Sequence, residues 1–326
     1  HTETTFKMSG VLAVFTGEDL IRDGVLPIPM TLPFKRPGGH PALSEPYYAM
    51  AQGVVRFVGQ PVAIVIAESP EIALEGGQCL EIEYEEIPAV TDLQKAIAPD
   101  APRLCSDLPD NVAASDIKGD AKKVKKAFAK ASHVTQMNLV NNRVVGSPLE
   151  PRALVCEIEP KSGNLILHAM HQSISRLQTV LCEIFQLETD KLRIIVRDIG
   201  GGFGTKVAIH PEDVLVVYAA KKINRTVKWT ATRSEEFQAS VHGRDQIYFG
   251  ELAFDSEGKI LALKLDILAN TGAYLNNPAL LIPLGIMPKV ITSVYHIPAL
   301  YYETRCVLTN TAPIGAYRGA GRPEGI

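Results

Sequence analysis

A run of four glycines around one aromatic residue, Gly200 to Gly204, places the strongest constraint on the fold of this chain. The apolar segment 192–196 before the run predicts a strand, and the segment 212–223 after His210-Pro211 predicts a helix. Glycines in such a turn permit unusual dihedral angles and let backbone N–H groups approach an anion closely. The run therefore predicts a loop that binds phosphate or pterin oxygens, with an ordinary tight turn as the alternative.

The glycine run fits neither of the two common nucleotide motifs. A P-loop needs lysine directly after the last glycine, but Thr205 stands before Lys206. Thr205 also occupies the last glycine position of the pattern G-x-G-x-x-G. A second glycine loop, from Arg318 to Pro323, carries two guanidinium groups that can bind oxyanions in a bidentate way. Two such loops in one chain point to a large anionic cofactor.

Charge and apolar content exclude several classes of partner. The formal net charge of the 326 residues is only −3 and the charges are interspersed, so no basic surface for nucleic acid or anionic membrane is expected. The longest apolar stretches are far shorter than the roughly 20 residues of a membrane-spanning helix. No secretory signal is visible, so we expect a cytoplasmic protein. The five cysteines are widely spaced, which argues against disulfide, zinc and iron–sulfur frameworks in this chain.

Strand and helix patterns predict an α+β chain in three parts. The first part, 1–95, contains a buried strand over 57–67, a helix that begins at Ser69-Pro70, and an alternating strand over 80–84. The second part, 96–132, is rich in proline and aspartate and is predicted to be a linker with one short helix. The third part, 133–326, alternates strands and helices and includes a hairpin over 249–269.

Several motifs, in this order, resemble the large subunit of the xanthine dehydrogenase, aldehyde oxidase and carbon monoxide dehydrogenase family. Segments 58–63 and 84–90 are similar to the family's α/β hammerhead domain. The remaining motifs are similar to the first part of its molybdenum-cofactor-binding domain, which consists of mixed sheets and helices. They are Leu149-Glu150-Pro151-Arg152, His171-Gln172, Gly200 to Lys206, and Ala316 to Glu324. The resemblance covers nearly the whole chain.

The resemblance implies a set of residues at a molybdopterin. The cofactor would be held by Gln172, Gly201, Gly202, Phe203, Gly204, Arg318, Gly319 and Ala320. Of these, Gln172, Phe203 and Arg318 would contact the molybdenum ligands, Gln172 through its amide and the others through the backbone. Val207 and Ala320 would line the substrate pocket. The molybdopterin would be present as such or in its cytosine dinucleotide form.

The same resemblance implies an oxidoreductase that hydroxylates its substrate with oxygen from water. The family's general base is a glutamate in a Q-G-x-G-E type motif, which this chain lacks, so we expect it beyond Ile326 and assign no catalytic residue here. The chain is thus expected to be a fragment that is inactive alone. Gly319 replaces the cysteine of carbon monoxide dehydrogenases, and Val207 and Ala320 replace two residues of xanthine-type members. An aldehyde or an N-heteroaromatic substrate is therefore expected.

The implied partners are an FAD-binding subunit, a subunit with two [2Fe-2S] clusters, and the C-terminal remainder of the large subunit, assembled as a dimer of heterotrimers. One alternative is a truncated, non-catalytic module that keeps the fold and the partner surface. Another is a member that resembles carbon monoxide dehydrogenase without its active-site cysteine. A weaker alternative is an unrelated nucleotide enzyme that uses the glycine loop.

Overall fold

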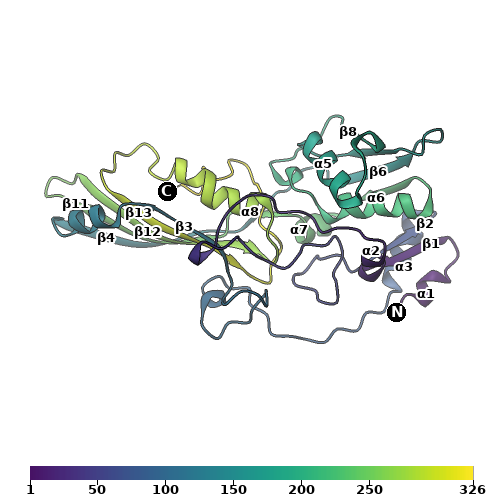
Figure 1. Ribbon diagram of the computed structural model, residues 1–326, viewed down its shortest axis with the longest axis horizontal. Coiled ribbons are helices and arrows are strands. Elements are labelled where there is room, and N and C mark those ends of the chain that lie inside the picture. Colours follow the sequence, from purple (N-terminus) through teal and green to yellow (C-terminus); the bar gives the residue numbers. More distant parts are fainter. Residues whose placement is uncertain (326) are drawn as a thin grey trace. The chain divides into compact units, whose positions relative to one another are not determined.

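The computed structural model describes residues 1–325, which form two compact units that are each discontinuous in sequence (Figure 1). Unit 1 comprises residues 1–29, 46–88 and 147–240. Unit 2 comprises residues 30–45, 89–146 and 241–326. Helices and mixed sheets occur in both units, which confirms the predicted α+β class. No helix among the described residues is long and apolar enough to cross a membrane.

The N-terminal part of unit 1 is a two-stranded antiparallel sheet with short helices. Strand β1 (Val11–Thr16) pairs with β2 (Ala63–Ala67), and the helices are α1 (Glu3–Phe6), α2 (Gly17–Arg22) and α3 (Pro70–Gln78). As predicted, Ser69 caps α3, because its hydroxyl accepts a hydrogen bond from the Ile72 N–H. The strand predicted over 80–84 is absent from the structure. Alternation alone does not supply a pairing partner, and Ile82 remains 44% exposed.

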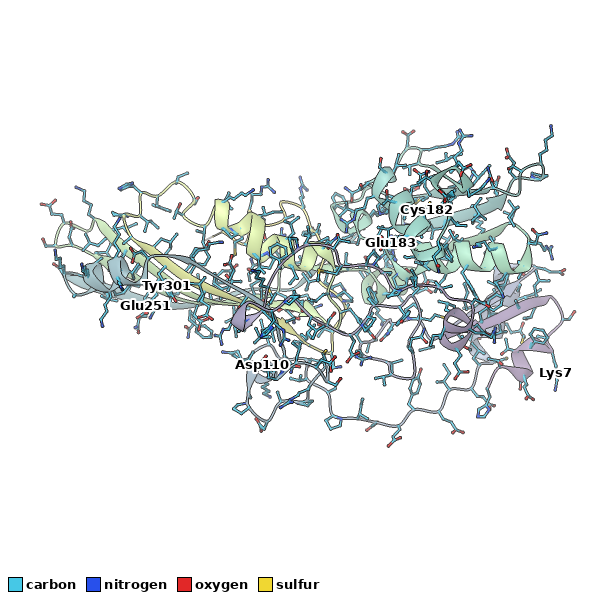
Figure 2. The ribbon with its side chains drawn as sticks, viewed as in Figure 1. Lys7, Asp110, Cys182, Glu183, Glu251 and Tyr301 are labelled. Carbon is cyan, nitrogen blue, oxygen red and sulfur yellow. The ribbon has the colours of Figure 1, made fainter. Side chains whose placement is uncertain are left out.

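A four-stranded sheet in the order β8-β7-β6-β9 forms the second part of unit 1. Its strands are β6 (Ala153–Ile158), β7 (Leu165–Ala169), β8 (Leu192–Ile195) and β9 (Val227–Thr230), with helices α5 (Ile174–Phe185), α6 (Pro211–Ile223) and α7 (Arg233–Ala239). Helix α5 is amphipathic: the adjacent residues Cys182 and Glu183, labelled in Figure 2, are buried and exposed respectively. Helix α6 is buried along most of its length. The short 3₁₀ helices η3 (Thr189–Lys191) and η4 (Thr205–Val207) flank β8 and the glycine loop.

Unit 2 contains a five-stranded sheet in the order β3-β13-β12-β11-β4. The strands are β3 (Val112–Gly119), β4 (His133–Asn141), β11 (Gln246–Phe254), β12 (Ile260–Gly272) and β13 (Leu300–Leu308). Strands β11 and β12 form the predicted hairpin, whereas β12 and β13 are parallel. Tyr248, Leu265, Ile267 and Tyr302 form a buried cluster with Met287 and Ile291. Helix α4 (Ala121–Phe128) packs through Val124 against Ala253 and Ala262.

The segment predicted as a linker, 96–132, contains both β3 and α4. Strand β3 owes its place to pairing with β13, whose residues follow nearly two hundred positions later and could not be matched to it from local pattern. Smaller elements complete unit 2: η1 (Pro37–Gly39), η2 (Lys95–Ile97), β5 (Val144–Val145), β10 (His242–Gly243), α8 (Asn277–Leu281), the π-helix η5 (Ile282–Ile286) and η6 (Met287–Lys289).

Candidate cofactor-binding site

The first glycine loop joins β8 to α6 in unit 1 and depends on left-handed backbone. Gly201 and Gly204 have φ of 94° and 95°, and Phe203 has φ of 49°. A left-handed conformation costs an aromatic residue on the order of 1–3 kcal/mol and persists only where surrounding contacts impose it. The Phe203 side chain is 41% exposed. The loop thus has a strained, partly exposed aromatic residue at its centre.

Gln172, just before α5, contacts the loop directly. Its side-chain Oε1 accepts a hydrogen bond of 3.0 Å from the Gly204 N–H, and its backbone N–H donates to the Lys206 carbonyl at 2.8 Å. A Cβ on Gly202 would lie 2.6 Å from the Gln172 Cδ, so only glycine fits there without displacing the amide. Because Oε1 faces Gly204, the amide NH₂ is the end that remains available. That NH₂ has no hydrogen-bond partner among residues 1–325.

Glu150 and Lys206 hold the other side of the loop. A carboxylate oxygen of Glu150 accepts a hydrogen bond from the Gly200 N–H. The Lys206 ammonium donates to the Glu150 carbonyl at 2.9 Å and lies 3.9 Å from the Glu150 carboxylate. Burial lowers the pKa of Lys206, although the nearby Glu150 charge opposes this shift. The loop is therefore fixed to the segment that precedes β6.

The two backbone donors at the centre of the loop are unused. The Gly201 N–H donates to the Ile199 carbonyl, and the Thr205 N–H donates to the Gly202 carbonyl. The N–H groups of Gly202 and Phe203 donate to no acceptor in the part of the chain that the structure describes. Together with the Gln172 NH₂ they form a set of neutral donors, which suits an anionic or oxo ligand. The residues present therefore fit the oxygen-rich cofactor that the sequence predicted.

Two buried histidines support the loop from the side of α6. The His171 Nε2 donates to the Ala208 carbonyl at 3.1 Å, while its Nδ1 accepts from the Ser173 N–H at 3.0 Å. The His210 Nε2 donates to the Thr205 carbonyl at 3.0 Å. Burial lowers the pKa of both histidines. Each ring is therefore neutral and carries its proton on Nε2, where it fixes a carbonyl next to the loop.

A buried charge network lies between β6, α6 and α7. The Arg152 guanidinium donates to both Glu212 carboxylate oxygens at 2.7 and 3.2 Å, and its Nε donates to Glu236 at 3.0 Å. The Arg152 N–H also donates to Glu236, at 2.7 Å. All three side chains are at most 11% exposed. Next to this network, burial raises the pKa of Asp213 to about 7. The network ties the start of β6 to both helices.

The second glycine loop, taken from here on with its flanking residues as Tyr317 to Glu324, belongs to unit 2 and is stabilised within that unit. Gly319 and Gly321 both have φ of 95°, and Ala320 has φ of 30°. The N–H groups of Arg318 and Gly319 have no acceptor among the described residues. The Arg318 side chain is exposed and forms no ion pair within residues 1–325. This loop thus also presents unused donors and a positive charge.

The structure brings Gln172, Gly202, Phe203 and Gly204 together in unit 1, and Val207 follows them, half-buried, at the end of η4. Arg318, Gly319 and Ala320 lie together in unit 2. A shared site for the two loops stays a prediction. The residues that bond to the loops, Glu150, Lys206, His210 and Arg244, had no role predicted from the sequence. One signal was available: Glu212 and Asp213 directly precede the apolar stretch 214–220 and were therefore candidates for buried charges.

Models of two known domain families match the two parts of the chain. A model of the molybdopterin cofactor-binding domain matches residues 105–326. A model of the a/b hammerhead domain of aldehyde oxidase and xanthine dehydrogenase matches residues 1–88. The chain is 33% identical over 276 residues to the 6-hydroxypseudooxynicotine dehydrogenase complex subunit gamma of Paenarthrobacter nicotinovorans, covering 84% of this chain and 34% of that protein.

Two further similarities cover nearly all of the chain. It is 33% identical over 334 residues to the carbon monoxide dehydrogenase large chain of Hydrogenophaga pseudoflava, covering 98% of this chain and 40% of that protein. The crystal structure of quinoline 2-oxidoreductase from Pseudomonas putida 86 matches with a TM-score of 0.88 at 32% identity, over 98% of this chain and 40% of that one. The chain therefore spans well under half the length of these relatives.

The matched molybdopterin-binding domain and the two glycine loops with unpaired backbone N–H groups identify the class of protein as molybdopterin-binding. The chain belongs to the family of xanthine dehydrogenases, aldehyde oxidases and carbon monoxide dehydrogenase large chains, as its motifs predicted. The family consists of molybdopterin-binding oxidoreductase subunits, many of them parts of multi-subunit complexes.

Proposed function

We propose that this chain is part of the molybdopterin-binding subunit of a molybdenum hydroxylase that oxidises an aldehyde or an N-heteroaromatic substrate with oxygen from water. The observation that carries the proposal is the fixed amide of Gln172, whose NH₂ is unused beside the unpaired N–H groups of Gly202 and Phe203. The domain order proposed is a hammerhead over 1–95, a segment over 96–132 that contributes β3 and α4 to unit 2, and a molybdopterin-binding domain over 133–326.

In this proposal the protein positions a cofactor that carries the chemistry. When bound, the molybdenum cofactor supplies an activated water-derived oxygen and accepts two electrons. The Gln172 NH₂ donates a hydrogen bond to a cofactor oxygen. The N–H groups of Gly202 and Phe203 orient the cofactor from the first loop, and the Arg318 and Gly319 N–H groups do so from the second. Gly201, Gly204 and Ala320 provide the left-handed backbone that these positions require.

Two positions support the proposed substrate class. Gly319 has no thiol that could bind a second metal, which disfavours oxidation of carbon monoxide. Val207 and Ala320 offer apolar surface where purine-oxidising members of the family carry other residues. The match to a quinoline 2-oxidoreductase, whose name specifies an N-heteroaromatic compound, agrees with this choice.

The proposal includes a general-base glutamate on the remainder of the large subunit, because this chain supplies none. It also includes an FAD-binding subunit and a subunit with two [2Fe-2S] clusters, in a cytoplasmic dimer of heterotrimers, and the cytosine dinucleotide form of the pterin. The second candidate function is a non-catalytic module that keeps the fold and the partner surface. Molybdenum analysis separates the two, since such a module would contain no metal even with its partners present.

Gln172→Glu tests the role of the amide NH₂ without disturbing the loop. A carboxylate keeps the oxygen that accepts from Gly204 N–H, but it replaces the donating NH₂ with an acceptor. We expect kcat of the full enzyme to fall about tenfold, which corresponds to the loss of one hydrogen bond. Steady-state kinetics with a heteroaromatic aldehyde, combined with metal analysis, would measure this effect.

Gln186→Glu is the matched control, because Gln186 lies at the other end of α5 and is exposed. The same chemical change there should leave kcat unaltered. Equal kcat in the Gln172→Glu enzyme and the wild type, at equal molybdenum content, would show that the amide NH₂ contacts no reacting group.

A further inference from the structure

We propose that Arg244 is a positioning residue that fixes the second glycine loop in the shape required to bind an anionic cofactor. This inference rests on the proposed function and assigns a role to a residue outside every motif discussed above. Arg244 lies between β10 and β11, and its side chain is only 9% exposed. A guanidinium so deeply buried must satisfy its donors within the protein.

Among residues 1–325, every hydrogen-bond acceptor of the Arg244 guanidinium belongs to the second loop. One terminal nitrogen donates to the Tyr317 carbonyl at 3.0 Å and to a Glu324 carboxylate oxygen at 3.1 Å. The other donates to the Arg318 carbonyl at 2.6 Å. The guanidinium also lies 5.1 Å from the centre of the Tyr317 ring, within the range of a cation–π contact. Arg244 thus holds both ends of the loop.

Glu324, which pairs with Arg244, also fixes the middle of the loop. Its second carboxylate oxygen accepts from the Gly321 N–H at 2.6 Å, and its carbonyl accepts from the buried Tyr248 hydroxyl at 2.7 Å. The Glu324 side chain is 1% exposed, so it is shielded from water. A Cβ on Gly321 would lie 2.6 Å from Ile286, which leaves the loop little freedom to shift. Arg244 and Glu324 therefore act as one buried clamp.

The clamp determines which backbone groups of the loop are available. The carbonyls of Tyr317 and Arg318 are occupied by Arg244, and the Gly321 N–H is occupied by Glu324. The N–H groups of Arg318 and Gly319 are left without an acceptor among residues 1–325. With the carbonyl oxygens bound to a cation, the available surface of the loop is rich in donors and suits an anion.

The backbone at Arg244 is itself under constraint. Arg244 and Asp245 have φ of 65° and 67°, a costly conformation for two consecutive residues that are not glycine. Asp245 is held by Arg143 at 2.7 Å and by the Asn270 amide at 2.9 Å. The turn brings the guanidinium to the loop, which supports a positioning role.

The test compares Arg244→Lys with wild type in the complete enzyme complex. Lysine keeps the charge beside Glu324 but cannot reach the Tyr317 and Arg318 carbonyls at once. We expect kcat to fall at least about tenfold, as is typical when a residue that orients a metal site is changed. We also expect an altered electron paramagnetic resonance spectrum of the partly reduced enzyme, with an unfolding midpoint close to that of wild type.

Glu324→Gln serves as the second variant, because glutamine can keep an oxygen acceptor for Gly321 N–H while its NH₂ cannot accept from Arg244, so the ion pair and its hydrogen bond are lost. Arg305→Lys is the matched control: Arg305 pairs with Asp266 on the five-stranded sheet of unit 2 and is 27% exposed, so its replacement should change neither kcat nor the spectrum. Wild-type kcat and spectrum in both Arg244→Lys and Glu324→Gln would overturn the inference. If Gln172→Glu slows the enzyme and Arg244→Lys does not, this inference alone is wrong. A wild-type complex without molybdenum would refute the proposed function and the inference together.

Discussion

Replacing Arg152 with methionine is expected to lower the free energy of unfolding by about 3–5 kcal/mol. Methionine fills similar space but leaves the buried carboxylates of Glu212 and Glu236 without their common partner. Removal of one member of a buried ion network costs far more than its net contribution, because the remaining charges stay desolvated. Urea denaturation followed by circular dichroism would measure the change.

Two comparisons make the Arg152 prediction specific. Arg22→Met removes an exposed ion pair with Asp19 in the same unit, where the Arg22 side chain is 66% exposed, and it should leave the denaturation midpoint unchanged. Adding Glu212→Leu and Glu236→Met to the Arg152 variant should recover much of the lost stability, since it removes both carboxylates that lost their common partner. A loss of unfolding free energy below about 1 kcal/mol in the single variant would mean that water reaches the network. The network would then not hold the start of β6 to α6 and α7.

Gly202→Ala is expected to reduce turnover of the complete enzyme about 100-fold, as displacement of a positioning group by about 1 Å can do. The φ angle at Gly202 is acceptable for alanine, so the backbone conformation can be kept. The new methyl group, however, would stand 2.6 Å from Cδ and Oε1 of Gln172. The amide must move, which breaks its bond to Gly204 N–H and removes the cofactor's donor.

Gly77→Ala is the control for this prediction. Gly77 lies in α3 of the same unit and has open space where a Cβ would be added. Alanine is favoured over glycine in helices by roughly 1 kcal/mol, so that variant should be as active as wild type and slightly more stable. An active Gly202→Ala enzyme with full cofactor content would show that Gln172 is free to move and that its contact with the loop is incidental.

The sequence predicted the elements that have strong local signals. Proline at the first helical position and a capping serine located α3, and His210-Pro211 located α6. The hairpin of β11 and β12 followed from the turn sequence Asp255-Ser256-Glu257-Gly258 between two strand-like segments. The pattern at 80–84 also alternates but forms no strand, because a strand needs a neighbour and local pattern does not specify one. Strand β3 was not predicted, because it forms by pairing with β13, which lies far along the chain.

The candidate site was predictable where geometry is encoded in residue type. Gly201 and Gly204 have the left-handed backbone that glycines permit. The resemblance assigned Gln172 to the same cofactor as the loop, but its hydrogen bond to the Gly204 N–H was not predicted and comes from the structure. The supporting charges were not predictable, because burial of Arg152 or Arg244 depends on how distant segments pack. Charged residues are mostly exposed in folded proteins, so a sequence alone predicts exposure. Which charged residues are buried is seen only in the folded structure.

The first glycine loop and Gln172 are proposed to hold a molybdopterin. The direct measurement is the molybdenum and pterin content of the full-length protein purified with its partner subunits, by mass spectrometry for the metal and by fluorescence of the released, oxidised pterin. We expect equal amounts of molybdenum and pterin in the wild-type complex, and a clear reduction of both in Gly202→Ala but not in Gly77→Ala. A folded wild-type complex that contains neither molybdenum nor pterin would contradict it.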